Sequence, residues 1–491
     1  MREHLRRLSG QTLLYGLGDA GTRVIALVLL PVYAHVLSPD EYGELALASL
    51  TVVLTSLLLE SGQRTAYFRL YYMNEEARYR RRMTGTVVLY LLIAATLLLP
   101  LLRILYRHVA GSVLEVPGLL PLLDIVLATT FCDIGTVVPF AVFRAEQKAA
   151  IYARLAIGRA ALSATLNLIA VLGLREGVHG ILLANLITSA VFCAACLIIT
   201  ARQIEWKIDF ALLGRLLSFG LPHVPANLAG WIMTLSDRLF LQHYGSLFQV
   251  GIYTVGYQIA GAVNMLTGWF NTAWAPYAMS LSERPDAPRV YARLLTYGMT
   301  LFAFVALCTT LFAVEAVTLL TAAEYAQAAR VVGLVAAAYL FYELYYLLSL
   351  GFDLTFRPWF PSLVIVLAAA VNIVLNIALI PGYGFMGAAV ATALSYLIMP
   401  ILVFPAVQRL YPIPYELGRL CGLLATTFAA GSCGVWVKTG ALGIDLPVGV
   451  GLLGAWGLVL WIAGYFSAAE LAAARSMAGE LIARVRPTQR R

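Results

Sequence analysis

Residues 11–37, QTLLYGLGDAGTRVIALVLLPVYAHVL, form an apolar run that is long enough to cross a membrane. About 20 apolar residues suffice for a hydrocarbon core of roughly 30 Å. The run nevertheless contains Asp19 and Arg23, although a charged side chain near the centre of a bilayer costs about 2.5–3.5 kcal/mol. Because these two residues are four positions apart, they share one face of a helix. They form either an ion pair that fixes helix packing or part of a polar cavity through which a charged substrate passes.

The composition of the whole chain agrees with a protein made of many such helices. Of its 491 residues, 61% are hydrophobic and 12% are charged, whereas a soluble protein carries about 25% charged residues. The sequence therefore predicts an all-α polytopic membrane protein. The net charge of +8 indicates membrane topology and contact with anionic lipids rather than binding of nucleic acid. The six cysteines all lie within apolar runs, so we expect no metal site and no cofactor.

Hydropathy and loop charge predict about 14 transmembrane helices. An even number of spans places both termini on one side of the membrane. The loops on that side hold most of the arginines, among them Arg78, Arg144, Arg202, Arg357 and Arg409. The loops on the other side offer only Arg107, Arg175 and Lys438. The positive-inside rule then places both termini in the cytoplasm.

The two halves of the chain share a weak internal repeat. Asn167 corresponds to Asn376, and Lys148 to Arg357, at one offset of 209 residues. An offset of six spans preserves orientation, which predicts two six-helix lobes related by a pseudo-two-fold axis along the membrane normal. The predicted parts are an N-lobe at 1–205, a C-lobe at 206–411, two further helices at 412–467 as a candidate groove for a lipid tail, and a basic cytoplasmic tail at 468–491.

Polar residues within the predicted spans indicate where a substrate passes. Arg159 lies too deep to reach the lipid headgroups easily, so we expect it to line a cavity together with Arg23. Arg64 lies near the inner face, where it either reaches the headgroups or lines the entrance. Asn167 and Tyr342 add groups that suit the hydroxyls and faces of a sugar.

Several charged residues are candidates for ion coupling or gating. In the first lobe these are Asp19 and Asp133. In the second lobe, Asp237 and Arg238 form either a structural pair or a gate. Glu343 is either a protonatable carboxylate or the hydrogen-bond partner of a neighbouring tyrosine.

The sequence favours a transporter over an enzyme. It has no phosphate-binding P-loop, and its loops are too short to hold a catalytic domain. The first lobe carries the deep arginines, whereas the second carries tyrosines and neutral polar groups. A cationic wall opposite an aromatic wall suits an anionic head attached to a sugar, because guanidinium groups bind phosphate oxygens in forked geometry.

Four segments carry a family resemblance: LSPDEYGE at 37–44, FGLPHVP at 219–225, LSDRLFL at 235–241 and VGIY at 250–253. In this order they resemble the polysaccharide transporter (oligosaccharide flippase, Wzx-like) family of the multidrug/oligosaccharidyl-lipid/polysaccharide (MOP) exporter superfamily. The resemblance implies flipping of a polyprenyl-pyrophosphate-linked oligosaccharide from the cytoplasmic to the outer leaflet. It implies a prokaryotic cytoplasmic membrane, with a lipid-linked glycan, membrane lipids and polymerase or export machinery as partners.

The expected mechanism places the pyrophosphate at Arg23 and Arg159, with Arg64 at the entrance, while the two lobes rock around the substrate. The energy comes either from the membrane potential or from ion antiport, for which the candidates are Glu343, Asp133 and Asp19. A MATE-like drug or cation antiporter and a lipid II flippase of the same superfamily stay open as alternatives. A membrane glycan polymerase or ligase is a third, although the predicted outer loops are too short for its catalytic residues.

Overall fold

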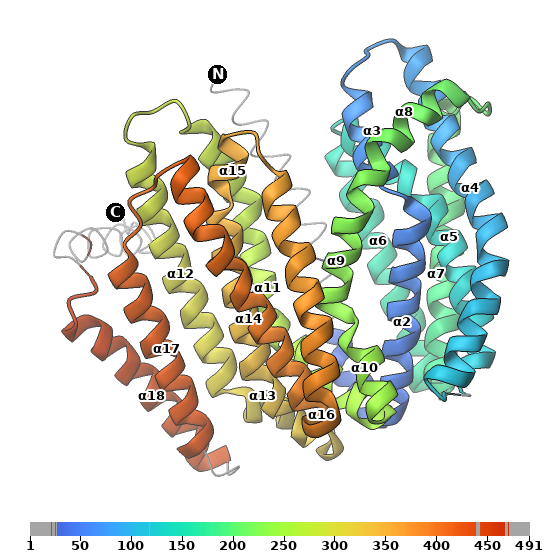
Figure 1. Ribbon diagram of the computed structural model, residues 1–491. Helices are drawn as coiled ribbons and strands as arrows, with labels where there is room; N and C mark the ends of the chain where they lie inside the picture. Colours follow the sequence, from blue (N-terminus) through green and yellow to red (C-terminus); the bar gives the residue numbers. More distant parts are fainter. Residues whose placement is uncertain are drawn as a thin grey trace, which may run out of the picture.

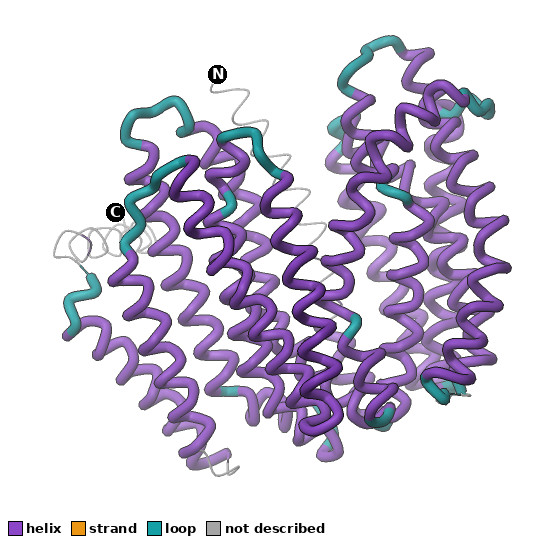
Figure 2. The backbone as a smooth tube through the Cα atoms, in the orientation of Figure 1, coloured by secondary structure: helices purple, strands orange, loops and turns teal. Residues whose placement is uncertain are grey.

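The computed structural model describes residues 21, 25, 27–116, 118–437, 442–466 and 470. Every regular element in this part of the chain is a helix, as Figure 2 shows. Asp19 and Arg23, the charged candidates of the first predicted span, lie outside the described residues. The predicted all-α fold is confirmed.

The helices follow one another with short connections. The first half contains α2 (Pro39–Glu60), α3 (Gln63–Tyr71), α4 (Ala77–His108), α5 (Leu119–Ala145), α6 (Ala149–Leu168) and α7 (Gly177–Thr200). A middle segment contains α8 (Phe210–Gly220), α9 (Val224–Leu235) and α10 (Asp237–Tyr244). The second half contains α11 (Leu247–Ser280), α12 (Ala287–Leu311), α13 (Ala313–Leu320), α14 (Ala329–Leu348), α15 (Leu350–Leu354), α16 (Trp359–Leu410), α17 (Leu417–Val437) and α18 (Leu442–Ile462).

Ten helical segments of the described chain are long and apolar enough to cross a membrane. The 52-residue α16 covers two predicted spans, and its one non-helical residue is Gly384, with φ +54°. The predicted span 212–241 is instead divided among α8, α9 and α10, each of which is short. The chain is therefore a multi-pass membrane protein, and the exact number of spans stays a prediction.

Two groups of helices lie side by side in Figure 1. In the first group, α5 packs against α2, α4 and α7, and in the second, α14 packs against α11, α12 and α16. At the far edge of the second group, α17 and α18 pack against each other and against α12. The short α8 packs against α3 and α4 of the first group, while α9 packs against α2 and α16. The boundary between lobes at residue 206 stays a prediction.

The helices α2 and α11 begin in the same way at the lower end of Figure 1. Ser38 accepts a hydrogen bond from the backbone N–H of Glu41, whose side chain bonds back in a capping box. Ser246 accepts one from the backbone N–H of Gln249. Ser246 lies 208 residues after Ser38, and Gln249 lies 208 residues after Glu41. Equivalent helix starts at the same end agree with a parallel repeat.

The two helices then cross at a pair of glycines, which closes this end of the molecule. A Cβ atom on Gly43 would lie 2.2 Å from the carbonyl oxygen of Leu247. A Cβ atom on Gly251 would lie 1.9 Å from the carbonyl oxygen of Pro39. Such distances are far below van der Waals contact, so the close approach of the two backbones requires glycine at both positions.

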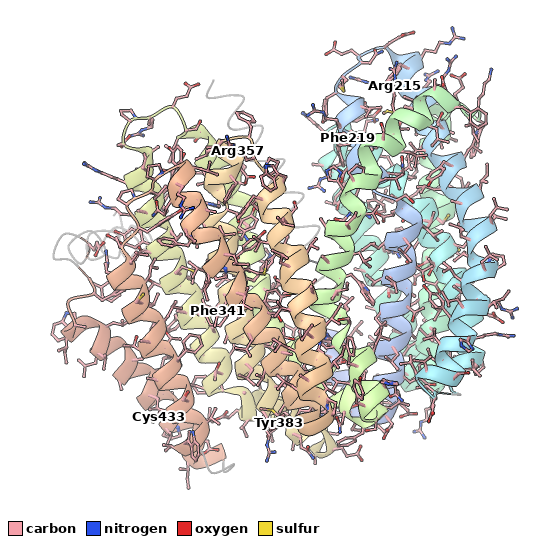
Figure 3. All side chains as sticks on the ribbon, viewed as in Figure 1. Arg215, Phe219, Phe341, Arg357, Tyr383 and Cys433 are labelled. Atoms are coloured by element: carbon pink, nitrogen blue, oxygen red, sulfur yellow. The ribbon has the colours of Figure 1, made fainter. Side chains whose placement is uncertain are left out.

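Hydrogen bonds between distant segments strengthen the closed end. The hydroxyl of Tyr325 donates to the carbonyl of Leu37 at 2.8 Å. The side chain of Gln242 donates to the carbonyl of Leu114 at 3.0 Å. The opposite end holds Arg215 and Arg357, whereas Tyr383 lies at the closed end (Figure 3).

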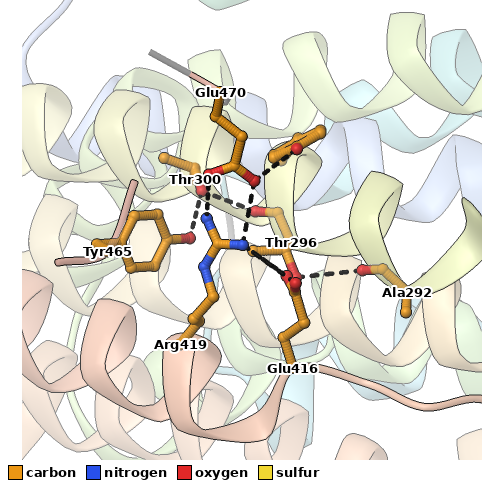
Figure 4. Close-up of polar contacts among 8 residues, drawn as sticks. Ala292, Thr296, Thr300, Glu416, Arg419, Tyr465 and Glu470 are labelled. Atoms are coloured by element: carbon orange, nitrogen blue, oxygen red, sulfur yellow. Dashed lines mark hydrogen bonds and ion pairs between the residues drawn. The ribbon is translucent and has the colours of Figure 1, made fainter. Parts of the chain in front are cut away.

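The end of the described chain is tied to the second group by a cluster around Arg419 (Figure 4). Its guanidinium donates to Glu416 and to Glu470, with a shortest distance of 3.0 Å to each. Tyr297 of α12 also donates to Glu470, at 2.6 Å. The ring of Tyr465 lies under the guanidinium, 4.8 Å from its Cζ atom. These contacts anchor residue 470 to α12 and α17.

Candidate functional site

Two adjoining cavities lie among the helices. The first lies mainly within the first group, and the second is lined by helices of both groups. The first has a volume of about 1120 Å³ and is lined by α2, α3, α5, α6, α7 and α9. The second has a volume of about 830 Å³ and is lined mainly by α2, α9, α10, α11, α14 and α16. Ser49, Val53, Asn185 and Gly230 line both cavities. The two cavities are therefore neighbours that share a wall.

Arg159 lies on α6 and lines the first cavity. Its guanidinium donates to the carboxylate of Asp133 on α5 at 2.5 Å and to the hydroxyl of Ser189 on α7 at 3.1 Å. The side chains of Arg159 and Asp133 keep 31% and 23% of their surface exposed. The structure thus brings two predicted site residues together, as an ion pair that an incoming ligand can reach.

Two further arginines line the first cavity. Arg64 on α3 donates to Glu60 on α2 at 2.6 Å, and its side chain stays 57% exposed. Arg144, near the end of α5, lies beside the ring of Phe68 at 5.9 Å. A position at the end of a predicted span is typical of a loop residue, so the sequence does not predict Arg144 as a site residue. Among the described lining residues, three arginines against two carboxylates give a net positive charge.

Asn167 lines neither cavity but supports the wall of the first. It is 2% exposed, and its amide nitrogen donates to Ser163 and Asn185 at 3.1 Å each. Both of these partners line the first cavity. Asn167 therefore positions cavity residues, and the contact with the substrate that the sequence predicts stays a prediction.

Arg238 lines the second cavity, a position that the sequence alone does not predict. The residue is 3% exposed, and its guanidinium donates to the carbonyl of Thr234 at 2.6 Å. Its Cζ atom lies 4.3 Å from the ring centroid of Tyr257, which is a cation–π contact. Tyr342 also lines this cavity, and its ring meets Tyr396 edge-on at 5.6 Å. The second cavity therefore presents aromatic surface around one buried cation.

Asp237 does not form an ion pair with Arg238 among the described residues. Adjacent residues of a helix point in different directions, so two such side chains do not face each other. Asp237 is fully buried, and it accepts hydrogen bonds from Tyr253 at 2.6 Å, Asn376 at 2.8 Å and Thr392 at 2.9 Å. It ties α10 to α11 and α16, and it lines neither cavity.

Glu343 on α14 is also fully buried and lies outside the lining of both cavities. Its Oε2 atom accepts a hydrogen bond from the amide nitrogen of Asn271 on α11 at 3.1 Å. The observed partner is thus an asparagine of another helix rather than a neighbouring tyrosine. Within the described ranges, no group of three or more acidic, histidine or cysteine residues is arranged to hold a metal ion.

A protein-family model described as "Polysaccharide biosynthesis protein" matches residues 32–330, which is more than half of the chain. No curated protein matches the chain in sequence.

The fold is similar to those of solved transporters. A structure of the lipid II flippase MurJ in an inward closed conformation matches with a TM-score of 0.75 at 13% identity, over 92% of this chain and 99% of that one. A mutant of the Vibrio cholerae MATE transporter VcmN matches with 0.58 at 15% identity, over 82% and 96%. An inward-facing multidrug resistance MATE family transporter of the MOP superfamily matches with 0.60 at 16% identity, over 82% and 97%. At these identities the likeness concerns the fold alone.

Proposed function

The chain belongs to the polysaccharide biosynthesis protein family, and we propose that it flips a polyprenyl-pyrophosphate-linked oligosaccharide from the cytoplasmic to the outer leaflet. The observation that carries this proposal is the pair of adjoining cavities, one lined by arginines and the other by tyrosines. Such a space suits a ligand with an anionic head and a sugar. The lipid tail stays in the bilayer, for which α17 and α18 offer a candidate groove.

The pyrophosphate binds at the arginines of the first cavity. Guanidinium groups offer planar, forked donors that match phosphate oxygens, and such charge-assisted bonds are stronger than neutral ones. Arg159 is the least exposed of the three described arginines, and Arg64 and Arg144 add positive charge on the same lining. Arg23, which lies outside the described residues, is a further candidate. Asp133 balances the positive charge of Arg159 before the substrate binds. The incoming pyrophosphate then balances part of that charge.

The glycan occupies the remaining space and the second cavity. The two volumes, about 1120 and 830 Å³, match or exceed the range of roughly 300–1,000 Å³ that is typical of small-molecule sites. Tyr342, Tyr257 and Tyr396 offer flat apolar faces with hydroxyl groups at their edges.

Transport proceeds by alternating access. With both termini in the cytoplasm of a prokaryotic cell, the crossing of α2 and α11 closes the outer end, and the cavities take up substrate from the inner side. Moving two negative charges outward is favoured by an inside-negative potential and yields about 4–5 kcal/mol per 100 mV. Besides the membrane potential, ion coupling or gating is a further possible drive, for which Asp19, Asp133 and Asp237 are candidates. Polymerase or export machinery would receive the flipped glycan.

The test is a flipping assay with a fluorescent lipid-linked oligosaccharide in proteoliposomes, read by an impermeant quencher. Arg159→Gln should slow flipping at least tenfold, because each lost charge-assisted hydrogen bond is worth about 1.5–3 kcal/mol. The matched control is Arg103→Gln, which breaks the exposed pair between Arg103 and Asp124 outside both cavities.

Equal flipping by Arg159→Gln and by the wild type would refute the assigned site. Transport of a cationic dye without any flipping of glycan would instead support a MATE-like antiporter. Flipping of lipid II in preference to other lipid-linked glycans would make the protein a lipid II flippase.

A further inference from the structure

The contact between Glu343 and Asn271 leaves two buried oxygens without a donor. The Oε2 atom of Glu343 accepts from the amide nitrogen of Asn271 at 3.1 Å. The Oε1 atom of Glu343 and the Oδ1 atom of Asn271 are both buried, and neither receives a hydrogen bond from the described residues. Such atoms are rare in folded proteins, and each one calls for a physical reason.

One added proton satisfies both atoms. An ionised carboxylate offers only acceptors, whereas an amide offers donors on its nitrogen and an acceptor on its oxygen. The ionised pair therefore makes a single hydrogen bond, whichever way the amide is turned. When Glu343 carries a proton on Oε1, that hydroxyl donates to Oδ1 of Asn271, and the amide nitrogen still donates to Oε2. The two side chains then form a cyclic pair with two hydrogen bonds.

Among the residues that the structure describes, no basic side chain forms an ion pair with Glu343. The groups that interact with it are Tyr342 and Tyr346 on its own helix and Thr267 and Asn271 on α11. On the neighbouring helices α12 and α16, the basic side chains Arg289, Arg293 and Arg409 lie on exposed faces. Glu343 itself is completely buried. A buried carboxylate without a cationic partner favours the neutral acid.

The amide partner of Glu343 is carried by the helix that closes the outer end. Gly251 and Asn271 both lie on α11, and 20 residues of helix span about 30 Å. Pro276 lies inside the same helix, one turn beyond Asn271, where it removes a backbone hydrogen bond. A displacement of α11 relative to α14 during the opening of the crossing with α2 would change the contact between Asn271 and Glu343.

We propose that Glu343 and Asn271 form a proton-binding site of the transport cycle. Glu343 is the neutral acid while the outer end is closed, and it releases its proton to water when α11 withdraws Asn271. The proton taken up while the cytoplasmic side is open is thus released on the outer side, in the same direction as the glycan. This coupling rests on the proposed flippase function, whereas the protonation of Glu343 does not.

The protonation is tested by infrared spectroscopy of the full-length protein reconstituted in lipid. At neutral pH the wild type should show a carboxylic acid C=O band that is absent from Glu343→Gln and retained in Asp353→Asn, a matched exposed carboxylate on α15. Glu343→Gln should fold, because glutamine and asparagine side chains also form a cyclic pair with two hydrogen bonds. Asn271→Leu provides a second measurement, since it should shift the frequency of the band. Spectra of wild type and Glu343→Gln that coincide in this region would overturn the proposal.

The coupling is tested in the flipping assay with the membrane potential clamped at zero. An imposed pH gradient should change the rate of the wild type and of Asp353→Asn, and it should leave the rate of Glu343→Gln unchanged. A Glu343→Gln rate that still follows the gradient would overturn the coupling role. If the wild type flips no glycan at all, the proposed function fails, and the infrared band still decides whether Glu343 is protonated.

Discussion

The crossing of α2 and α11 predicts a specific effect of the substitution Gly251→Ala. The new methyl carbon would lie 1.9 Å from the carbonyl oxygen of Pro39, whereas carbon–oxygen contacts normally lie at about 3.3–3.6 Å. The two backbones must therefore separate by about 1.4 Å at this point. Overpacking of this kind costs roughly 1–3 kcal/mol.

This cost applies only while the outer end is closed, because opening that end separates the two helices. A difference of 1–3 kcal/mol between two states shifts their ratio by about 5–150-fold. Gly251→Ala should therefore raise the ratio of the outward-open to the outward-closed state by about 5–150-fold. The symmetric substitution Gly43→Ala should act in the same direction, since its methyl carbon would lie 2.2 Å from the carbonyl oxygen of Leu247.

The assay is the rate at which an impermeant maleimide, added from the outer side, labels a cysteine at Ser49, a residue that lines both cavities. The background lacks the six native cysteines. The matched control is Gly261→Ala on the same helix, where an added Cβ meets no atom within 4 Å. Both substitutions gain the same helix propensity of about 1 kcal/mol, so only the crossing distinguishes them. Equal labelling rates for the two variants would refute the gate.

Three further predictions concern the cavities and the C-terminal cluster. Asp133→Asn should tighten the binding of a pyrophosphate-containing lipid, and Arg159→Gln should weaken it about tenfold or more, since a charge-assisted hydrogen bond is worth about 1.5–3 kcal/mol. Native mass spectrometry of the purified protein measures both affinities, and equal affinities would contradict the assignment. Arg419→Ala should lower the unfolding free energy by about 1–3 kcal/mol, because it leaves two carboxylates without their shared partner. The control Arg284→Ala breaks an exposed pair and should change the unfolding free energy by less than about 0.5 kcal/mol. Denaturation in detergent distinguishes the two variants. Asn167→Ala should slow glycan flipping less than Arg159→Gln does, since it removes support from the cavity wall rather than a ligand-binding group, and a larger effect would show that Asn167 acts directly.

Hydrophobicity and buried charge were sufficient to predict the membrane fold and part of the cavity lining. Arg159 and Asp133 stand out in the sequence because a charge within an apolar helix is costly unless it has a partner or faces water, and the structure places both on one cavity wall. The sequence could not assign Arg238 to the second cavity, because its neighbour Asp237 suggested a local pair. Helical geometry points the two side chains to different places, one toward tyrosine rings and the other toward a buried network.

The breaks within helices were also beyond the reach of hydropathy. An average over apolar residues is the same whether a span is straight, divided or continued into the next one. The segment 212–241 is divided into α8, α9 and α10, with Pro222 between α8 and α9 and Pro225 in the first turn of α9, and its parts pack against both groups of helices. The turn within α16 depends on the positive φ of a single residue, Gly384.

The two asparagines at equivalent positions of the internal repeat make equivalent hydrogen bonds. Asn167 donates to Ser163, four residues earlier on its helix, and Asn376 donates to Asn372 in the same relation. Both asparagines are buried, at 2% and 0% exposure. Each therefore holds a polar network inside an apolar helix bundle.

The residues that differ between the repeats are those that set the character of each cavity. Asp133 and Arg159 form the ion pair of the first cavity, and the residues 209 positions later are Tyr342 and Ala368. The tyrosine lines the second cavity and the alanine is fully buried. One scaffold thus carries an ionic site in one copy and an aromatic surface in the other. A ligand that bridges the two cavities must itself be asymmetric, with its charge at one end and its hydroxylated, weakly polar part at the other.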